Sequence, residues 1–350
     1  MSTWDLLAAL PVLVEGYELE PHEVAMSSEF LRKTTVIRLH GGGEQGLGED
    51  VTYAVSDQEE LQRAGTERWA LAGSWTLASF AAYVRTLELF PQPTDRPEFR
   101  LYRNWAFDSA ALDLALRQAG TTLHAALQRE CLPLRFVASL RLGEPPSLQP
   151  LRRRLQIAPD LQFKLDPTPS WDEELIAEIV ALNAVESVDL KGQYEGTIVD
   201  NPADPELYRR VVEAFPDAWI EDPKLTPQTE AILRPHRARI TWDAPIHSVA
   251  DIQALPWPPR TINIKPSRLG GLQSLLDVYD YCAAQEIGCY GGGQSELSVG
   301  RGQIQYLASL FHADSPNDVA PAGYNLPEPP QDLPASPLAP APSPLGFRWG

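Results

Sequence analysis

The chain has 350 residues and a mass of 38.7 kDa. Its 29 Lys and Arg residues against 47 Asp and Glu residues give a formal net charge of −18, which argues against a nucleic-acid partner and against an anionic membrane surface. The length suits one large α/β barrel or two ordinary domains, and a hydrophobic fraction of 43% predicts a packed core.

The lack of a membrane-spanning or secretory segment and the spacing of the cysteines predict a cytoplasmic protein. No apolar run reaches the roughly 18–20 residues that a membrane-spanning helix needs, and the N-terminal segment has neither the basic region nor the cleavage site of a secretory signal. Cys131, Cys282 and Cys289 have no metal-binding or redox spacing, so we expect free thiols in a reducing compartment. These features are compatible with a monomer or a homo-oligomer.

Residues 1–120 predict an α+β domain. Thr35–His40 alternates and is rich in β-branched residues, which is typical of a strand, and Val12–Glu20 is a weaker strand candidate. Five glycines between Gly41 and Gly48 predict a turn, and Glu49–Val55 is expected to form the next strand. Apolar residues then recur at helical spacing in two segments, Thr76–Leu89 and Trp105–Ala119.

From Leu134 onward, short apolar runs alternate with amphipathic segments. This alternation predicts a parallel sheet, and seven or eight strand–helix units predict a closed barrel. The expected strands are Arg135–Leu140, Leu161–Leu165, Ser187–Leu190, Ala218–Ile220, Arg239–Trp242, Thr261–Ile264 and Gly288–Tyr290. The expected helices include Asp172–Leu182, Pro205–Phe215, Gly271–Gln285 and Glu296–Phe311.

Eight prolines lie between Pro327 and Pro344, so this stretch can be neither a helix nor a central strand. It is either a disordered tail or an extended strap across the surface. We favour the strap, because the chain ends with Phe347 and Trp349, and two large aromatic side chains are costly to leave in water.

Single charged residues stand at the ends of five successive predicted strands: Lys164, Asp189, Glu221, Asp243 and Lys265. They are 25, 32, 22 and 22 residues apart, each about one strand–helix unit. In a barrel of this type the carboxyl ends of the strands meet at one mouth, where active sites lie. The alternative, five unrelated rim charges or salt bridges, does not explain why all five keep the strand period.

Three carboxylates on adjacent strands would repel one another unless a cation lay between them. Three carboxylates and water suit the octahedral oxygen site of Mg²⁺, so we expect Asp189, Glu221 and Asp243 to bind this ion. A substrate carboxylate on Mg²⁺ has an acidified α-proton, because the metal stabilises the enediolate that forms on deprotonation. A lysine at the mouth can take that proton.

These residues resemble the enolase superfamily, and most of all its muconate-lactonising-enzyme and o-succinylbenzoate-synthase branch. The resemblance implies a modified (β/α)7β barrel in residues 121–325. It also implies an α+β cap in residues 1–120 that the C-terminal segment 326–350 completes. The segments that carry the resemblance are Gly46-Leu-Gly-Glu49, Ala111–Leu116, Glu221-Asp-Pro223, Lys265–Gly271, Gly291–Glu296 and Gly300-Arg301.

Carried over by position, the resemblance implies that Asp189, Glu221 and Asp243 are the Mg²⁺ ligands and that Lys265 is a general acid or base. Glu296 would lie near the substrate carboxylate. Its alternative role is that of an acid in the first turn of a helix, where it would stabilise the helix N-terminus.

The sequence departs from the branch at two positions. The branch usually has Lys-x-Lys on its second barrel strand, with the second lysine as base, but Asp166 follows Lys164 here. Asp166 could be a base itself, pair with Lys164 or bind a cationic part of the substrate. The branch often has Asp-x-Asn on the third strand, whereas Lys191 follows Asp189 here, so Lys191 either replaces the missing base or offsets local negative charge.

We therefore expect an Mg²⁺-dependent lyase or cycloisomerase that acts on a small-molecule carboxylate. A racemase or epimerase, which needs acid–base groups on both faces of the substrate, is the first alternative, because Lys265 with Lys164 or Lys191 would supply them. A barrel that binds metal without turnover is the second.

Overall fold

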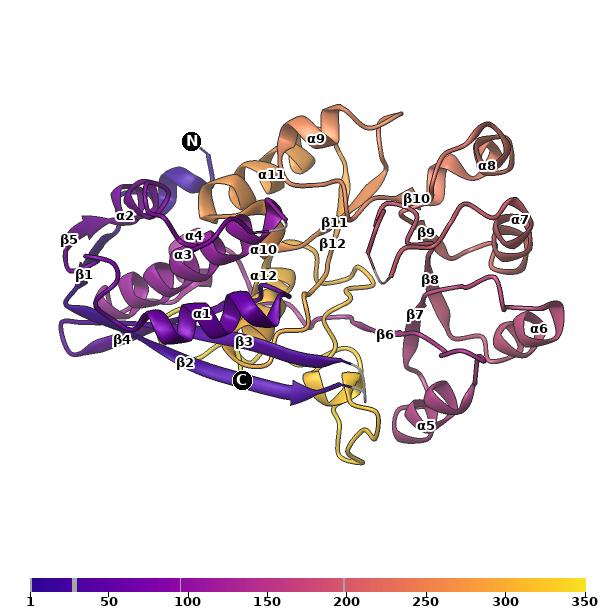
Figure 1. Ribbon diagram of the computed structural model, residues 1–350, viewed down its shortest axis with the longest axis horizontal. Coiled ribbons are helices and arrows are strands. Elements are labelled where there is room, and N and C mark those ends of the chain that lie inside the picture. The colour runs from indigo at the N-terminus through magenta and orange to yellow at the C-terminus, as the bar shows by residue number, and fades with distance from the viewer. Residues whose placement is uncertain (1, 27–29, 95, 198) are drawn as a thin grey trace.

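An antiparallel sheet of three strands, β2 (Gly16–Ala25), β3 (Leu31–Gly41) and β4 (Glu44–Asp50), underlies the first part of the chain. The structure, a computed structural model, describes residues 2–26, 30–94, 96–197 and 199–350. The long helix α3 (Glu98–Gln118) packs against β4, and together they form the α+β cap (Figure 1). The other cap elements are η1 (Trp4–Leu6), β1 (Pro11–Val14), α1 (Val55–Ala64), β5 (Gly73–Thr76), α2 (Leu77–Val84) and α4 (Leu123–Leu127).

The turn predicted for Gly41–Gly48 is wrong, because the turn is confined to residues 42–43 and β4 already begins at Glu44. Gly46 and Gly48 lie within the strand because helix α3 passes too close for a side chain. A β-carbon on Gly46 would lie 2.1 Å from the carbonyl oxygen of Ala110. The strand predicted at Glu49–Val55 is therefore displaced toward the N-terminus, and Val55 starts α1, a helix that the sequence pattern did not predict.

The second part of the chain is a ring of parallel strands with helices outside it. Five strands form one sheet in the order β10-β9-β8-β7-β6, and β11 pairs with β12. In Figure 1 the helices α5 to α8 line the outer side of this sheet. The strands are β6 (Val137–Leu140), β7 (Gln162–Leu165), β8 (Val185–Asp189), β9 (Trp219–Glu221), β10 (Ile240–Thr241), β11 (Thr261–Ile264) and β12 (Gly288–Gly291). The helices are α5 (Gln149–Ile157), α6 (Glu173–Ala181), α7 (Pro205–Ala214), α8 (Pro227–Leu233), η2 (Arg234–Arg239), α9 (Val249–Gln253), α10 (Pro266–Leu269), α11 (Leu272–Ala284), α12 (Val299–Phe311) and η3 (Ala322–Asn325).

Backbone contacts close the ring at its two gaps. The Asn263 amide donates to the Trp242 carbonyl at 2.9 Å and joins β11 to β10. Parallel bridges from Asp318 to Gly292 and from residue 317 to residue 136 insert a short eighth strand position between β12 and β6. Seven strand–helix units and a final strand therefore form the predicted (β/α)7β barrel, and the predicted fold class is confirmed.

The C-terminal segment is an extended strap, not a disordered tail. Leu338 exchanges backbone hydrogen bonds with Leu134, and Gly346 forms a bridge to Thr122. The Phe347 ring is fully buried, with ring centroids 6.4 Å from Trp105 of α3 and 6.0 Å from a tyrosine of α12. The strap thus ties the cap to the barrel, and at its end the Trp349 ring centroid lies 5.6 Å from that of Tyr306 of α12 (Figure 1).

Candidate active site

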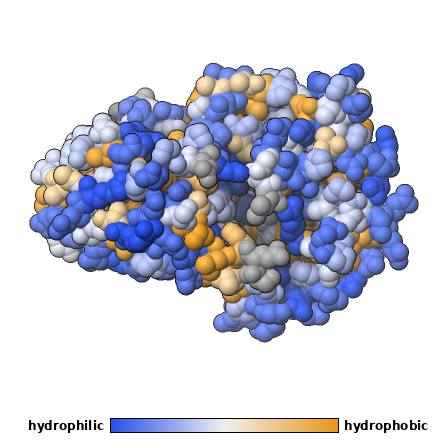
Figure 2. Space-filling model, viewed as in Figure 1, coloured by the Kyte–Doolittle hydropathy of each residue, from blue (hydrophilic) through white to orange (hydrophobic). Residues whose placement is uncertain are grey.

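The predicted site residues converge at the carboxyl ends of the barrel strands. Lys164 lies in β7, Asp189 and Glu221 are the last residues of β8 and β9, Asp243 follows β10 by two residues and Lys265 directly follows β11. All five side chains are buried. The space-filling view shows a hollow between the cap on the left and the barrel on the right (Figure 2).

Three buried carboxylates form a cluster at this end of the barrel. Asp189, Glu221 and Asp222 each place an oxygen within 4.8 Å of the other two. The sequence pattern did not predict Asp222, because alternation along a strand points neighbouring side chains to opposite faces. A left-handed backbone at Asp222, with φ of 48°, breaks that alternation. Its two oxygens accept hydrogen bonds from the backbone amides of Asp243 and Ala244, both at 2.8 Å.

Asp243, the third predicted ligand, faces cations and a hydroxyl group. Lys265 Nζ lies 2.8 Å from Asp243 Oδ2, and Arg268 Nη1 donates to Asp243 Oδ1 at 2.6 Å. The Tyr194 hydroxyl donates to Oδ2 at 2.7 Å. Arg268 and Tyr194 were not predicted, although Arg268 lies in the Lys265–Gly271 segment that carries the family resemblance. The role of Asp243 as a metal ligand stays a prediction.

Lys164 occupies the deepest position. Its Nζ contacts Glu221, lies 3.1 Å from Asp189 Oδ2 and lies 3.5 Å from Asp318 Oδ2. The Tyr290 hydroxyl donates to the other oxygen of Glu221. No sequence motif indicated Asp318 or Tyr290, because the eighth strand position that carries Asp318 is too short to show a pattern.

Lys191 and Asp166, the two departures from the family pattern, face each other. Lys191 Nζ lies 3.7 Å from Asp166 Oδ1 and also contacts Asp189. A left-handed backbone at Lys191, with φ of 53°, turns the side chain toward β7. The ammonium group of Lys191 therefore lies beside Asp166, the residue that stands where the branch usually has a second lysine.

The lysines of this chain are concentrated here. The sequence contains five lysines against 24 arginines, and three of the five are Lys164, Lys191 and Lys265. The Lys164 side chain is 2% exposed, whereas those of Lys191 and Lys265 are 13% and 9% exposed. Lys191 and Lys265 therefore keep more exposed surface than Lys164.

The electrostatics of the cluster favour a bound cation. Burial, opposed by Lys164 and reinforced by the neighbouring carboxylates, raises the pKa of Glu221 well above its usual value, and burial with Asp243 raises the pKa of Asp222 to about 7. Burial also raises the pKa of Asp166 to about 6 although Lys191 opposes it. Burial acts to raise the pKa of Asp189 too, but Lys191 and Lys164 outweigh it and the pKa is lowered. A buried set of carboxylate oxygens at this spacing fits a hard divalent cation.

Glu296 lies near the mouth but outside the carboxylate cluster. Its carboxylate accepts the Gln294 amide at 2.6 Å and lies 3.0 Å from Arg301 Nη2. It does not cap a helix, because α12 begins three residues later, at Val299. The acid at the N-terminus of α12 is Glu49, which comes from the α+β domain. Its carboxylate accepts hydrogen bonds from the backbone amides of residues 297, 298 and 300 at 2.7–3.0 Å.

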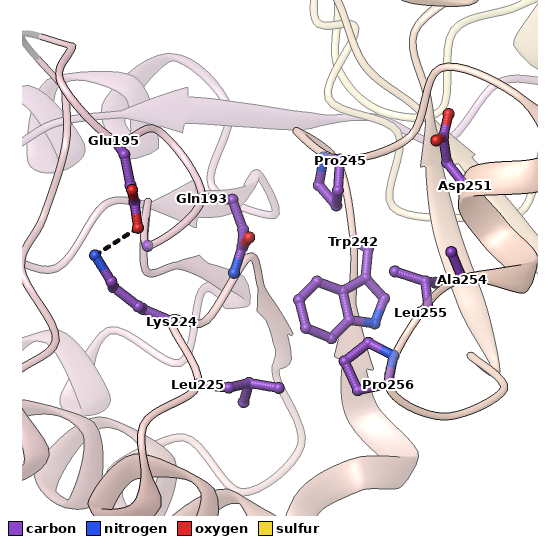
Figure 3. Close-up of a pocket in the computed structure, with 11 residues that line it drawn as sticks. Gln193, Glu195, Lys224, Leu225, Trp242, Pro245, Asp251, Ala254, Leu255 and Pro256 are labelled. Atoms are coloured by element: carbon purple, nitrogen blue, oxygen red, sulfur yellow. Dashed lines mark ion pairs between the residues drawn. The ribbon is translucent and has the colours of Figure 1, made fainter.

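A cavity of about 430 Å³ lies beside the site, where the segments after β8, β9 and β10 meet α9 (Figure 3). Lys224 and Glu195 form an ion pair of 2.7 Å at its edge, and the Trp242 indole lies in its wall. The predicted catalytic and metal-binding residues are not among the described residues that line it. This cavity is therefore distinct from the carboxylate cluster.

Solved structures have the same architecture as this chain. A dipeptide epimerase from Methylococcus capsulatus, complexed with Mg ion, matches with a TM-score of 0.66 and 18% identity over 90% of this chain and 92% of that chain. A muconate cycloisomerase from Pseudomonas fluorescens matches with a TM-score of 0.62 and 17% identity over 98% and 95% of the two chains. The fold is that of the enolase superfamily, so the predicted resemblance is confirmed.

The chain belongs to the family described as domain of unknown function DUF8230, whose N-terminal domain model matches residues 5–126 and whose C-terminal domain model matches residues 130–326. An o-succinylbenzoate synthase from Listeria innocua is 36% identical over 86 residues, which are 24% of this chain and 23% of that relative. One from Enterococcus faecalis is 28% identical over 298 residues, 79% of this chain and 76% of that relative.

In the part of the chain that the structure describes, no helix has the length and apolarity needed to cross a bilayer.

Proposed function

We propose that this protein is a Mg²⁺-dependent enzyme that removes the α-proton of a small carboxylate substrate, as a lyase or cycloisomerase. The observation that carries the proposal is that two partly exposed lysines, Lys191 and Lys265, contact the carboxylates of Asp189 and Asp243. The names of the o-succinylbenzoate synthase relatives support the lyase class.

The carboxylates of Asp189 and Glu221 would hold the cation, with Asp243 or Asp222 as the third ligand. A bound Mg²⁺ would stabilise the negative charge that develops on the substrate carboxylate as the α-proton leaves. Lys164 is enclosed by three carboxylates and fixes Glu221 and Asp189 without reaching a substrate. The ion pair with Asp166 orients Lys191. Burial lowers the pKa of Lys191, but Asp166 and Asp189 outweigh it and the pKa is raised, so Lys191 would take the proton at Nζ, in place of the base that is missing from β7, only with a bound cation that offsets these carboxylates.

The same geometry supports a racemase or epimerase as the second candidate. Lys191 follows β8 and contacts Asp166 and Asp189, whereas Lys265 follows β11 and contacts Asp243, so the two lysines would approach the substrate from different strands, one toward each face. One curated relative over part of the chain is named N-succinylamino acid racemase, and one matching structure is a dipeptide epimerase.

Hydrogen exchange at the α-carbon tests the proposal. The protein would be incubated with Mg²⁺ in D₂O and a panel of β-hydroxy acids, N-succinylamino acids and dipeptides, and exchange and product followed by NMR and mass spectrometry. We expect exchange that EDTA abolishes. No exchange across the panel, or exchange that persists with EDTA, would overturn the proposal.

Two single variants distinguish the lyase from the racemase. In a lyase, Lys191→Met abolishes exchange, and a product lacking the leaving group forms with the wild type. In a racemase, Lys191→Met and Lys265→Met each lose exchange from one enantiomer and keep it from the other. Lys33→Met is the matched control, because Lys33 pairs with Glu23 and Glu59 on the cap. It should exchange like the wild type.

A further inference from the structure

The side chain of Asn263 is buried without a partner. Asn263 lies on β11 two residues before Lys265, so the two side chains point to the same side of the strand, the barrel interior. Its side chain is 2% exposed, and within the described part of the chain neither Oδ1 nor Nδ2 has a hydrogen-bond partner. Buried amides are nearly always paired, so an unpaired one beside an active-site lysine indicates a contact made in another state of the site.

Gly292 provides the space in which this amide lies. A β-carbon on Gly292 would lie 2.4 Å from Asn263 Oδ1 and 2.8 Å from Lys265 Cε. The Gly292 amide donates to the Ile264 carbonyl at 3.0 Å, which fixes the glycine against β11. Asn263 Oδ1 and Lys265 Cε therefore both lie against the backbone of Gly292.

The partner of Lys265 in this structure is itself a candidate metal ligand. Lys265 Nζ lies 2.8 Å from Asp243 Oδ2, an oxygen that also accepts the Tyr194 hydroxyl. If Asp243 binds a cation, this oxygen is less available to the ammonium group. A lysine has three N–H donors, and Asn263 Oδ1 is an acceptor beside its stem that is not otherwise used.

We propose that Asn263 is a positioning residue that accepts a hydrogen bond from Lys265 Nζ and holds this group toward the substrate in the metal-loaded site. This inference rests on the proposed function, because it assigns Lys265 a role at the substrate. It adds an uncharged residue to the charged residues of the site. It also explains a glycine at position 292, because a side chain there would collide with Asn263 and Lys265.

Three variants test it in steady-state exchange with a substrate found in the panel. Asn263→Leu should lower kcat by about 10- to 100-fold with KM nearly unchanged, as is typical when a supporting contact of an active-site group is lost. Asn263→Asp, which keeps an acceptor oxygen, should restore most of that loss. Ser187→Ala is the matched control, because Ser187 is equally buried, its hydroxyl lacks a partner and it lies on β8, away from Lys265. A higher KM with unchanged kcat, or no loss at all, would overturn the proposal.

A second readout does not depend on turnover. Because the chain has five lysines, ¹³Cε-lysine labelling gives five signals, and Lys265→Met assigns one of them. In the Mg²⁺-loaded protein, Asn263→Leu should shift the Lys265 signal and leave the Lys33 signal in place, with unchanged Mg²⁺ affinity by calorimetry. An unshifted Lys265 signal, or a loss of Mg²⁺ affinity, would refute the positioning role. Absence of exchange in the wild type would refute the proposed function instead.

Discussion

The seam between cap and barrel and the mouth of the barrel both bury charged side chains. We use "seam" for Arg32, Glu49 and Asp113 and the groups that they bind. Arg32 donates to the backbone carbonyls of residues 51 and 52 in the cap and of residues 294 and 295 in the barrel.

The charged seam residues bind backbone groups or a single ion partner, whereas at the mouth several carboxylates lie close together and share three lysines and Arg268. Asp113 accepts the Phe347 amide at 2.8 Å and lies 2.7 Å from Arg348 Nε. At the mouth, by contrast, Glu221 lies among other carboxylates and its pKa is raised well above its usual value. Burial raises the pKa of Glu49 in the seam too, although backbone amides oppose the shift. A cluster of several carboxylates that raise one another's pKa values is typical of a functional site. The two regions should therefore respond differently to the loss of an acid.

The largest effect is expected from Glu221→Gln. This change removes the central carboxylate of the cluster, so Mg²⁺ binding by calorimetry should become undetectable and α-proton exchange should fall to background. Glu49→Gln, which removes an equally buried acid from the seam, should keep Mg²⁺ affinity and lower the free energy of unfolding by about 1–3 kcal/mol. The reverse pattern would contradict the distinction between the two regions.

Phe347→Ala tests the seam through packing. The ring is fully buried between α3 and α12, so we expect a loss of about 3–5 kcal/mol in the free energy of unfolding, measured with urea. Mg²⁺ affinity should change less than about two-fold, since the ring's aromatic partners are Trp105 and Tyr306, which are not among the clustered carboxylates or their ion partners. A loss below 1 kcal/mol would mean that the strap does not hold the cap in solution.

Asp222→Asn and Asp243→Asn, measured side by side, identify the third ligand. If Asp243 binds the metal, as the family resemblance implies, Asp243→Asn should weaken Mg²⁺ binding by about 10- to 100-fold. Asp222→Asn should weaken it about 10-fold at most, because the amide oxygen still accepts one of the two backbone bonds. A larger effect of Asp222→Asn would assign the direct ligand to Asp222.

The smallest effect concerns pH. Because the pKa of Asp222 is raised to about 7 and that of Asp166 to about 6, both carboxyl groups gain protons as the pH falls through these values. A cation must then displace protons, so Mg²⁺ affinity should fall by roughly ten-fold between pH 8 and pH 6. The thermal shift that Mg²⁺ produces should shrink over the same range. An equal shift at both pH values would show that these carboxyl groups are not linked to the metal.

The barrel, and the placement of charged residues at one end of its strands, could be predicted from the sequence alone. A strand has a period of two residues and each strand–helix unit returns the chain to the same end of the ring, so Asp189, Glu221 and Lys265 could be placed at one mouth from spacing alone. The strap also followed from composition, because prolines exclude helix and sheet while terminal aromatic residues need burial.

The remaining residues of the site are seen only in the tertiary structure. Asp222 and Lys191 enter through left-handed backbone conformations that no alternation rule predicts. Asp318 lies on a bridge to Gly292, 129 residues beyond Asp189 of the first carboxylate strand. Gly46 likewise belongs to a strand, not a turn, because α3 packs against it. Local patterns record what a residue does within its own element, whereas these four positions depend on neighbours that are distant in the sequence.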